Sequence, residues 1–340
     1  MQRGNVFVNI FLRFQLVISV IAISLFLTNE NFLFANTLYI SNHDNILPGI
    51  SLKIINDTKS SDDFDQIALA AIIPMVESML TNPIFKNNLP ANWGIIIDST
   101  WNRSEGYFSS DLKMENGAPA FLIGMNTFTS TSFNLSIIIH EATHLLHQEF
   151  RPHEELWVKE GVALLSEIIH VSFNPNILEG FRTPETSLIE DISPDFEKYL
   201  NKEKTLAQYG HLSLYFYYVY KLCGKENFLK KLLFSSHKET GIVFLDKILK
   251  ELFNAMKIDP VCSSFKNTFT EFQKARFDPK PFIPSKHIIF DSFMRGEIRS
   301  FPLNNMPRYS AQAFVIKKPS DCTNGNHILL SGKACLEITY

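Results

Sequence analysis

The sequence contains few cysteines, no excess of positive charge and no internal repeat. Its four cysteines include no C-x-x-C pair, which argues against a cysteine-based structural zinc site. With a formal net charge of −3 and 20% charged residues, the chain lacks the basic field needed to bind nucleic acid. What it does contain is 45% hydrophobic residues over 340 positions, enough for a large core in one large domain or two.

The N-terminal segment has the pattern of an export signal. Arg3 and Arg13 precede an apolar run from Leu16 to Leu27, which has the length of a signal-peptide core and is short for a membrane span of ~20 residues. Residues 1–35 are therefore interpreted as a signal peptide, with Ala35 as the expected cleavage position. The bulky Leu33 makes that cleavage site poor, so an uncleaved N-terminal membrane anchor remains as the alternative. Either interpretation predicts an exported protein, periplasmic or secreted.

The cysteines fit an oxidising compartment. The four cysteines, Cys223, Cys262, Cys322 and Cys335, can form two disulfides. The favoured pair is Cys322–Cys335, because it closes a short, turn-rich loop, worth ~3 kcal/mol in the chain-entropy model. The alternative is four unpaired, buried thiols.

The central motif is His140-Glu141-Ala142-Thr143-His144. The run 134–149 contains no glycine or proline and has apolar residues at helical spacing, which predicts a helix ended by Arg151-Pro152. In a helix, His140 and His144 lie one above the other and can share one ion, whereas Glu141 is displaced by about 100°. This is the H-E-x-x-H pattern, in which the intervening glutamate handles a proton.

Glu160 is the expected third ligand. It follows His153 by the same seven residues that separate His144 from Arg151, about 10.5 Å of helix in each direction. A returning antiparallel helix would thus bring Glu160 level with His144. His147 lies on the same helix as the two ligands and cannot bend back to the ion. Two histidines and one carboxylate with an open fourth position are the ligands of a catalytic zinc.

The motif followed by Trp157-Val158-Lys159-Glu160-Gly161-Val162-Ala163 resembles the gluzincins, most closely the small peptidase-MA-like bacterial proteins. That resemblance implies that His140, His144 and Glu160 bind zinc and that Glu141 is the general base. The metzincin pattern, by contrast, needs a glycine and then a histidine where this chain has His147 and Phe150.

One position departs from the gluzincin pattern. In thermolysin-like relatives an acidic residue four positions after the ligand glutamate often orients a ligand histidine, but this chain has Leu164 there. Ser166 and Glu167 are two candidates for that role. The departure supports an alternative function, a catalytically inactive zincin-fold protein that binds a partner or a surface at the cell envelope.

A strongly aromatic helix is predicted from Gln208 to Leu222. Relatives carry a similar helix that begins with a tyrosine, so Tyr209 or His211 is a candidate to donate a hydrogen bond to the oxyanion. The alternative is a core helix whose tyrosines only pack.

The chain as a whole is expected to be α+β. Strands are predicted at 50–55, 93–97 and 118–125, and helices at about 61–80, 134–149, 208–222, 226–234, 243–253 and 264–277. Pro74 is expected to kink or split the first helix. Residues 102–116 are interpreted as polar and turn-rich. By resemblance, the strand at 118–125 is expected to be a sheet edge that lines the cleft and pairs with an extended peptide.

Three segments follow from this order. Residues 1–35 are the export signal, and residues 36–280 a zincin-like domain with a small mixed sheet, the active helix and a helical C-terminal part. Residues 285–340 are a small β-rich module after the proline-containing linker 278–284. We expect a zinc metallopeptidase whose partner is a peptide or protein substrate, with membrane attachment only through an uncleaved N-terminus. The sequence does not indicate an oligomeric state.

Overall fold

The structure is a computed structural model that describes residues 39–56, 61–98, 106–124, 131–171, 187–189, 202–277, 298–299, 310–315, 322, 327–329 and 334–339. The predicted export signal at 1–35 and the linker at 278–284 lie outside these residues. Among the helices within them, none combines the length and apolar character needed to cross a membrane.

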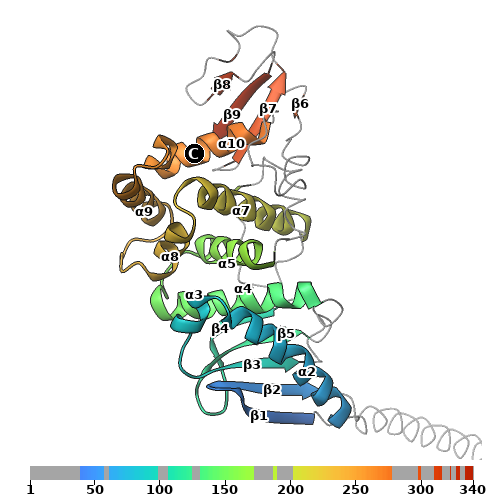
Figure 1. Cartoon of the computed structure of the whole chain (residues 1–340). Coiled ribbons are helices and arrows are strands. Elements are labelled where there is room, and N and C mark those ends of the chain that lie inside the picture. The colour runs from blue at the N-terminus through green and yellow to red at the C-terminus, as the bar shows by residue number, and fades with distance from the viewer. Residues whose placement is uncertain are drawn as a thin grey trace, which may run out of the picture.

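A five-stranded mixed sheet forms one end of the molecule (Figure 1). In spatial order its strands are β1 (Tyr39–Leu47), β2 (Ile50–Asn56), β3 (Trp93–Asp98), β5 (Pro119–Gly124) and β4 (Gly106–Lys113). Strands β2, β3 and β5 are parallel, whereas β1 and β4 close the two edges in antiparallel pairing. The central strands are almost continuously apolar, as is typical of parallel strands buried on both faces.

The two faces of the sheet belong to different clusters. Ile95 and Ile97 of β3 join the large core, which contains buried residues of the helices α2 (Ser61–Leu80) and α4 (Thr131–Phe150). The intervening Ile96 belongs to a small cluster with Met114 and Leu122. This alternation follows from the two-residue period of a strand. It places both helices against the same face.

The edge strand differs from the expectation. Strand β5, predicted at 118–125 to be the edge, lies between β3 and β4, and the edge strand is β4. Its residues fall inside the segment that we interpreted as polar and turn-rich. The sequence GYFSSDLK lacks an alternating pattern. It is a strand because its backbone pairs with β5 at Gly106–Phe108 and again at Lys113, with a register shift between the two. Strand β1 was not predicted either.

The helices stack away from the sheet. Figure 1 shows α4, then α5 and α7, then α10, with α8 and α9 to one side. Their bounds are α3 Pro83–Asn88, α5 Leu156–Val171, α7 Lys202–Leu222, α8 Glu226–Phe234, α9 Gly241–Met256, η3 Pro260–Ser263 and α10 Phe265–Phe277. The helices with predicted bounds are found within three residues of them, except α7, which starts at Lys202 and not at Gln208. Helix α2 ends at Leu80 as predicted, but Pro74 lies inside it and does not divide it.

A four-stranded sheet follows in the C-terminal tail. Its order is β6 (Ile298–Arg299), β7 (Ser310–Val315), β9 (Ala334–Thr339) and β8 (His327–Leu329). Apart from Cys322, the described residues of this segment are strands, in line with the β-rich character expected for 285–340. Leu336 and Ile338 of β9 are buried in the same large cluster as the helices. The small sheet is therefore continuous with the main core.

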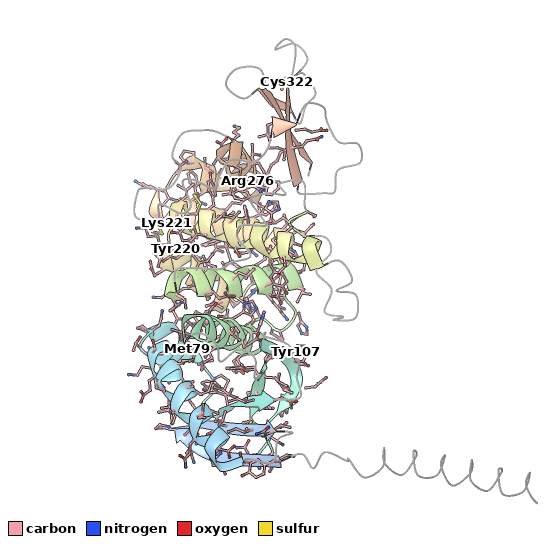
Figure 2. All side chains as sticks on the ribbon, turned by 90° about the vertical axis from the view of Figure 1, so that its right-hand side faces the viewer. Met79, Tyr107, Tyr220, Lys221, Arg276 and Cys322 are labelled. Carbon is pink, nitrogen blue, oxygen red and sulfur yellow. A yellow bond between two sulfur atoms is a disulfide. The ribbon has the colours of Figure 1, made fainter. Side chains whose placement is uncertain are left out.

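Two regions carry disulfide-bonded cysteines. Cys223 at the end of α7 is bonded to Cys262 in η3, so the alternative of four free thiols is wrong for this pair. Cys322, at the tail end of the molecule in Figure 2, is also disulfide-bonded. The side chain of Cys335 lies outside the described part of the chain, so the pairing Cys322–Cys335 stays a prediction.

Candidate metal centre

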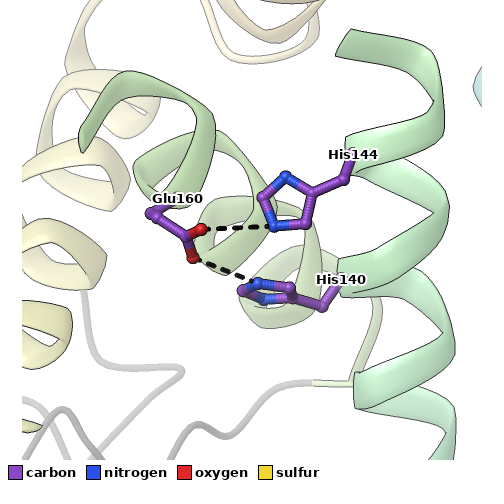
Figure 3. A group of neighbouring side chains, drawn as sticks. All are labelled: His140, His144 and Glu160. Carbon is purple, nitrogen blue, oxygen red and sulfur yellow. Dashed lines mark ion pairs between the residues drawn. The ribbon is translucent and has the colours of Figure 1, made fainter. Parts of the chain in front are cut away.

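Helix α4 presents two imidazoles on one face, and α5 brings a carboxylate to them (Figure 3). One Glu160 carboxylate oxygen, Oε2, lies 3.3 Å from Nε2 of His140, and Oε1 lies 3.5 Å from Nε2 of His144. One ligand atom from each of the three residues can be chosen so that all lie within 4.8 Å of one another, and the group could hold a metal ion. The antiparallel hairpin expected from the sequence therefore places Glu160 level with both histidines.

The turn of this hairpin is held by a buried ion pair. Helix α4 ends at Phe150, and the next residue, Arg151, forms a 2.6 Å salt bridge with Glu154. All five guanidinium N–H donors are used, because the remaining ones reach the backbone carbonyls of Ser235, His237 and Glu239. Glu154 in turn accepts the backbone N–H of Gly241 at the start of α9. The angle between α4 and α5 is thus fixed from the α8–α9 connection.

His140 is oriented from behind by Glu167. Its Nδ1 lies 2.5 Å from Oε1 of Glu167, whose Oε2 accepts the hydroxyl of Ser136. A carboxylate accepts and does not donate, so Nδ1 of His140 carries a proton and donates it to Glu167, which leaves Nε2 as the nitrogen that faces Glu160. Ser166, the other candidate for this role, donates to the carbonyl of Val162. The acid absent at Leu164 is therefore replaced one turn later on the same helix.

The burial of the group sets its protonation. Burial by itself lowers the pKa of His140, but the hydrogen bonds that its ring donates to Glu160 and Glu167 outweigh burial and raise that pKa well above the usual value. Burial lowers the pKa of His144 to about 4, so His144 is neutral, which is the state that binds a metal. Burial raises the pKa of Glu160, but His144, His140 and Tyr209 together hold it below its usual value.

Glu141 follows His140 on α4 and is not part of the group that could hold a metal ion. Its side chain is buried and contacts the start of β4, where it lies against the α-carbon of Gly106. Two residues later, the Phe108 ring stacks on His144 with centroids 6.1 Å apart. Neither contact was predicted, because β4 was not recognised as a strand.

The two oxyanion candidates on α7 face different neighbours. The side chain of Tyr209 makes a hydrogen bond to Glu160. His211 is fully buried, stacks on Phe272 of α10 and has its Nε2 3.1 Å from the amide nitrogen of Gln273. Residues two apart on a helix point about 200° apart, so one helix face cannot present both to the ligand group.

Gly161 explains why α7 can approach α5 so closely. A Cβ at this position would lie 2.2 Å from the ring of Phe216 on α7. The ring therefore occupies the space that a side chain at position 161, directly after Glu160, would need. This contact gives the glycine of the W-x-x-E-G-x-A segment a packing role between α5 and α7.

Comparisons with known proteins give no family assignment. No protein-family model matches the chain, and no curated protein matches it. Among solved structures, it is similar to the crystal structure of an aminopeptidase N family protein from Idiomarina loihiensis, with 14% sequence identity and a TM-score of 0.35. The alignment covers 82% of this chain and 50% of that chain. A likeness at this TM-score is too low to assign a fold or an activity.

Proposed function

We propose that the protein is an exported zinc-dependent peptidase of the gluzincin type, with the metal bound by His140, His144 and Glu160. The observation that carries the proposal is the convergence of these three side chains from two helices. The donor chemistry also fits, because two imidazole nitrogens and a carboxylate are the ligands of catalytic zinc. Glu167 supplies the outer contact that orients one ligand imidazole, as ligand histidines usually require.

The chain's own residues take distinct roles in this proposal. Glu141 is close to the ligands without being one, which suits a general base that accepts a proton from water and passes it to the leaving amine. Tyr209 is the preferred donor to the oxyanion, since its side chain already reaches Glu160. Zinc, when bound, would polarise the scissile carbonyl and lower the pKa of water to ~7.

The substrate in this proposal is a peptide or protein that binds in extended form. Strand β4 is an edge strand, and it carries Phe108 beside His144. An edge strand offers unpaired backbone groups to which an extended peptide can add as a further strand. The role first expected for β5 therefore passes to β4.

The proposal assigns residues 36–280 to the peptidase unit and residues 285–340 to a β-rich module that follows it. Export is supported by the N-terminal pattern of Arg3 and Arg13 before the apolar run 16–27. The Cys223–Cys262 disulfide also favours an oxidising compartment.

The test is hydrolysis of a broad fluorogenic peptide library by the purified protein, with and without a chelator. We expect cleavage that disappears on metal removal and returns with zinc. The matched control is Glu141→Gln, which should keep its zinc by plasma spectrometry and lose ~10²-fold or more in turnover. Zinc retention with no cleavage across the library would favour the binding-protein alternative. Loss of zinc from Glu141→Gln would show that the ligand assignment is wrong.

A further inference from the structure

Gly106, the first described residue of β4, lies in close contact with the Glu141 side chain. A Cβ built on Gly106 would be 2.4 Å from Oε1 of Glu141, 2.6 Å from its Cγ and 2.8 Å from its Cδ. These distances are below van der Waals contact, so no larger residue fits unless something moves. The clash involves the stem of Glu141 as well as its carboxylate, and the side chain is 5% exposed. Rotation of the carboxylate alone therefore cannot relieve it.

The backbone does not explain why this position is a glycine. Gly106 is not among the glycines with positive φ, whereas Gly117 in the β4–β5 turn has φ of 81° and nothing within 4 Å of its Cβ position. Gly117 is thus a conformational glycine and Gly106 is a steric one. Gly106 is also paired with Ile123 of β5, which limits how far β4 can retreat from α4.

We propose that Gly106 is a positioning residue for the general base, and that its bare α-carbon determines where the Glu141 carboxylate lies. The inference rests on the proposed function, in which Glu141 moves a proton. A general base must lie within hydrogen-bond reach of the proton that it takes, and a displacement of about 1 Å can cost ~10²-fold in rate. A methyl group on Gly106 would push the carboxylate away from that place while leaving the three ligands untouched.

The first experiment is Gly106→Ala in the full chain with zinc bound. We expect kcat to fall by about 10-fold or more, with KM within about twofold and zinc content unchanged. The matched control is Gly94→Ala in the same sheet. There the Cβ would meet Cγ and Sδ of Met114 at 2.3 Å, a flexible side chain in the small cluster on the other face. Its kcat should stay at the wild-type value. An equal loss of kcat in both variants would overturn the proposal.

A double-mutant cycle separates displacement of the base from general damage to the strand. Glutamine has the shape of glutamate, so Glu141→Gln keeps the contact with Gly106 but removes the base. If Gly106 acts by positioning that base, adding Gly106→Ala to Glu141→Gln should cost no further activity. If the two losses multiply, Gly106 acts through something else and the proposal fails.

A readout without activity keeps this inference separate from the proposed function. Crystal structures of the wild type and Gly106→Ala should show the Glu141 carboxylate moved relative to His140 and His144, with the β4–β5 pairing intact. An unmoved carboxylate beside a displaced β4 would refute the positioning role. If the wild type cleaves no peptide, the proposed function fails, and the position of the carboxylate still decides whether Gly106 sets it.

Discussion

Two groups of buried charged side chains lie on the α4–α5 hairpin, and the protein satisfies them differently. At the turn, the Arg151–Glu154 pair is closed by the protein alone, with five N–H donors matched to carboxylate and carbonyl acceptors and the Phe244 ring 3.4 Å below the guanidinium. Nearer the middle of α4, two imidazoles and a carboxylate face one another at 3.3 and 3.5 Å. In this second group, the side-chain atoms of all three residues that could bind a metal face one another.

The difference shows what each group can do. A buried ion pair with every donor matched requires nothing further and acts as a structural brace. Two imidazoles and a carboxylate that converge can instead share a proton, as the raised pKa of His140 indicates, or a metal ion, which binds the deprotonated ligands. The proximity of charges alone would not separate the two cases. They differ because every donor of the ion pair is matched, whereas the second group can exchange a proton for a metal ion.

The largest effect on stability is expected from breaking the Arg151–Glu154 ion pair. Arg151→Met leaves Glu154 buried without its partner, so the free energy of unfolding should fall by about 3–5 kcal/mol. Chemical denaturation of the metal-free protein measures this change. The control is Lys231→Met, which removes a salt bridge whose side chains are 37% and 36% exposed and should change stability by at most about 1 kcal/mol. Equal effects of the two variants would remove the distinction between brace and surface pair.

Loss of one of the three proposed metal ligands, His140, His144 and Glu160, should affect metal binding more than stability. Glu160→Gln removes the negative charge of the carboxylate whose two oxygens face the two imidazoles, so zinc should bind at least about 100-fold more weakly, beyond the loss usual for an outer contact. Competition with a chromogenic chelator measures this affinity. The metal-free protein should lose far less stability than Arg151→Met does. A Glu160→Gln variant that retains zinc fully would contradict the ligand assignment.

The hydrogen bond between Nδ1 of His140 and Glu167 should have the next largest effect on zinc affinity. Glu167→Gln weakens the hydrogen bond to Nδ1, and zinc affinity should fall by about 10–100-fold. Ser166→Ala is the matched control, because Ser166 lies one position away on α5 and donates to a backbone carbonyl. It should bind zinc as the wild type does. If Ser166→Ala weakens zinc binding as much as Glu167→Gln, the assignment of the outer contact is wrong.

The smallest effect on zinc affinity is expected at Ser136, which contacts Glu167 and not His140. Ser136 donates a 2.5 Å hydrogen bond to Glu167, and Ser136→Ala should reduce zinc affinity by at most about fivefold, the equivalent of one hydrogen bond of ~1 kcal/mol. The same chelator competition measures it. A larger loss than that of Glu167→Gln would mean that Ser136 acts on the ligand group by another route.

The ligand group could be predicted from sequence because it depends on helix geometry. His140 and His144 share a face by their spacing, and the seven-residue arms on each side of the turn place Glu160 level with them. The sequence did not decide whether Ser166 or Glu167 orients His140, because adjacent side chains on a helix point only about 100° apart. Their hydrogen bonds separate them in the structure.

The edge strand and its contacts could not be predicted in this way. The residues of β4 carry no alternating pattern, and their strand character comes from pairing with β5, a tertiary interaction. Gly106 and Phe108 were missed for that reason. The two α7 candidates could have been separated earlier, because Tyr209 and His211 lie about 200° apart round the helix.

The partners of Arg151 also constrain the order in which the chain can finish folding. The ligand residues span only positions 140–160, but the carbonyls that receive Arg151 lie 84 to 88 positions later in the chain. A chain that still lacks residues 235–241 can form the α4–α5 hairpin, but the Arg151 donors that bind the later carbonyls then have no acceptor. Closing the long loop between Arg151 and those carbonyls is slow. We therefore expect α4 and α5, which carry His140, His144 and Glu160, to reach their final relative orientation only after the α8–α9 connection has folded. This holds however early their own residues are synthesised.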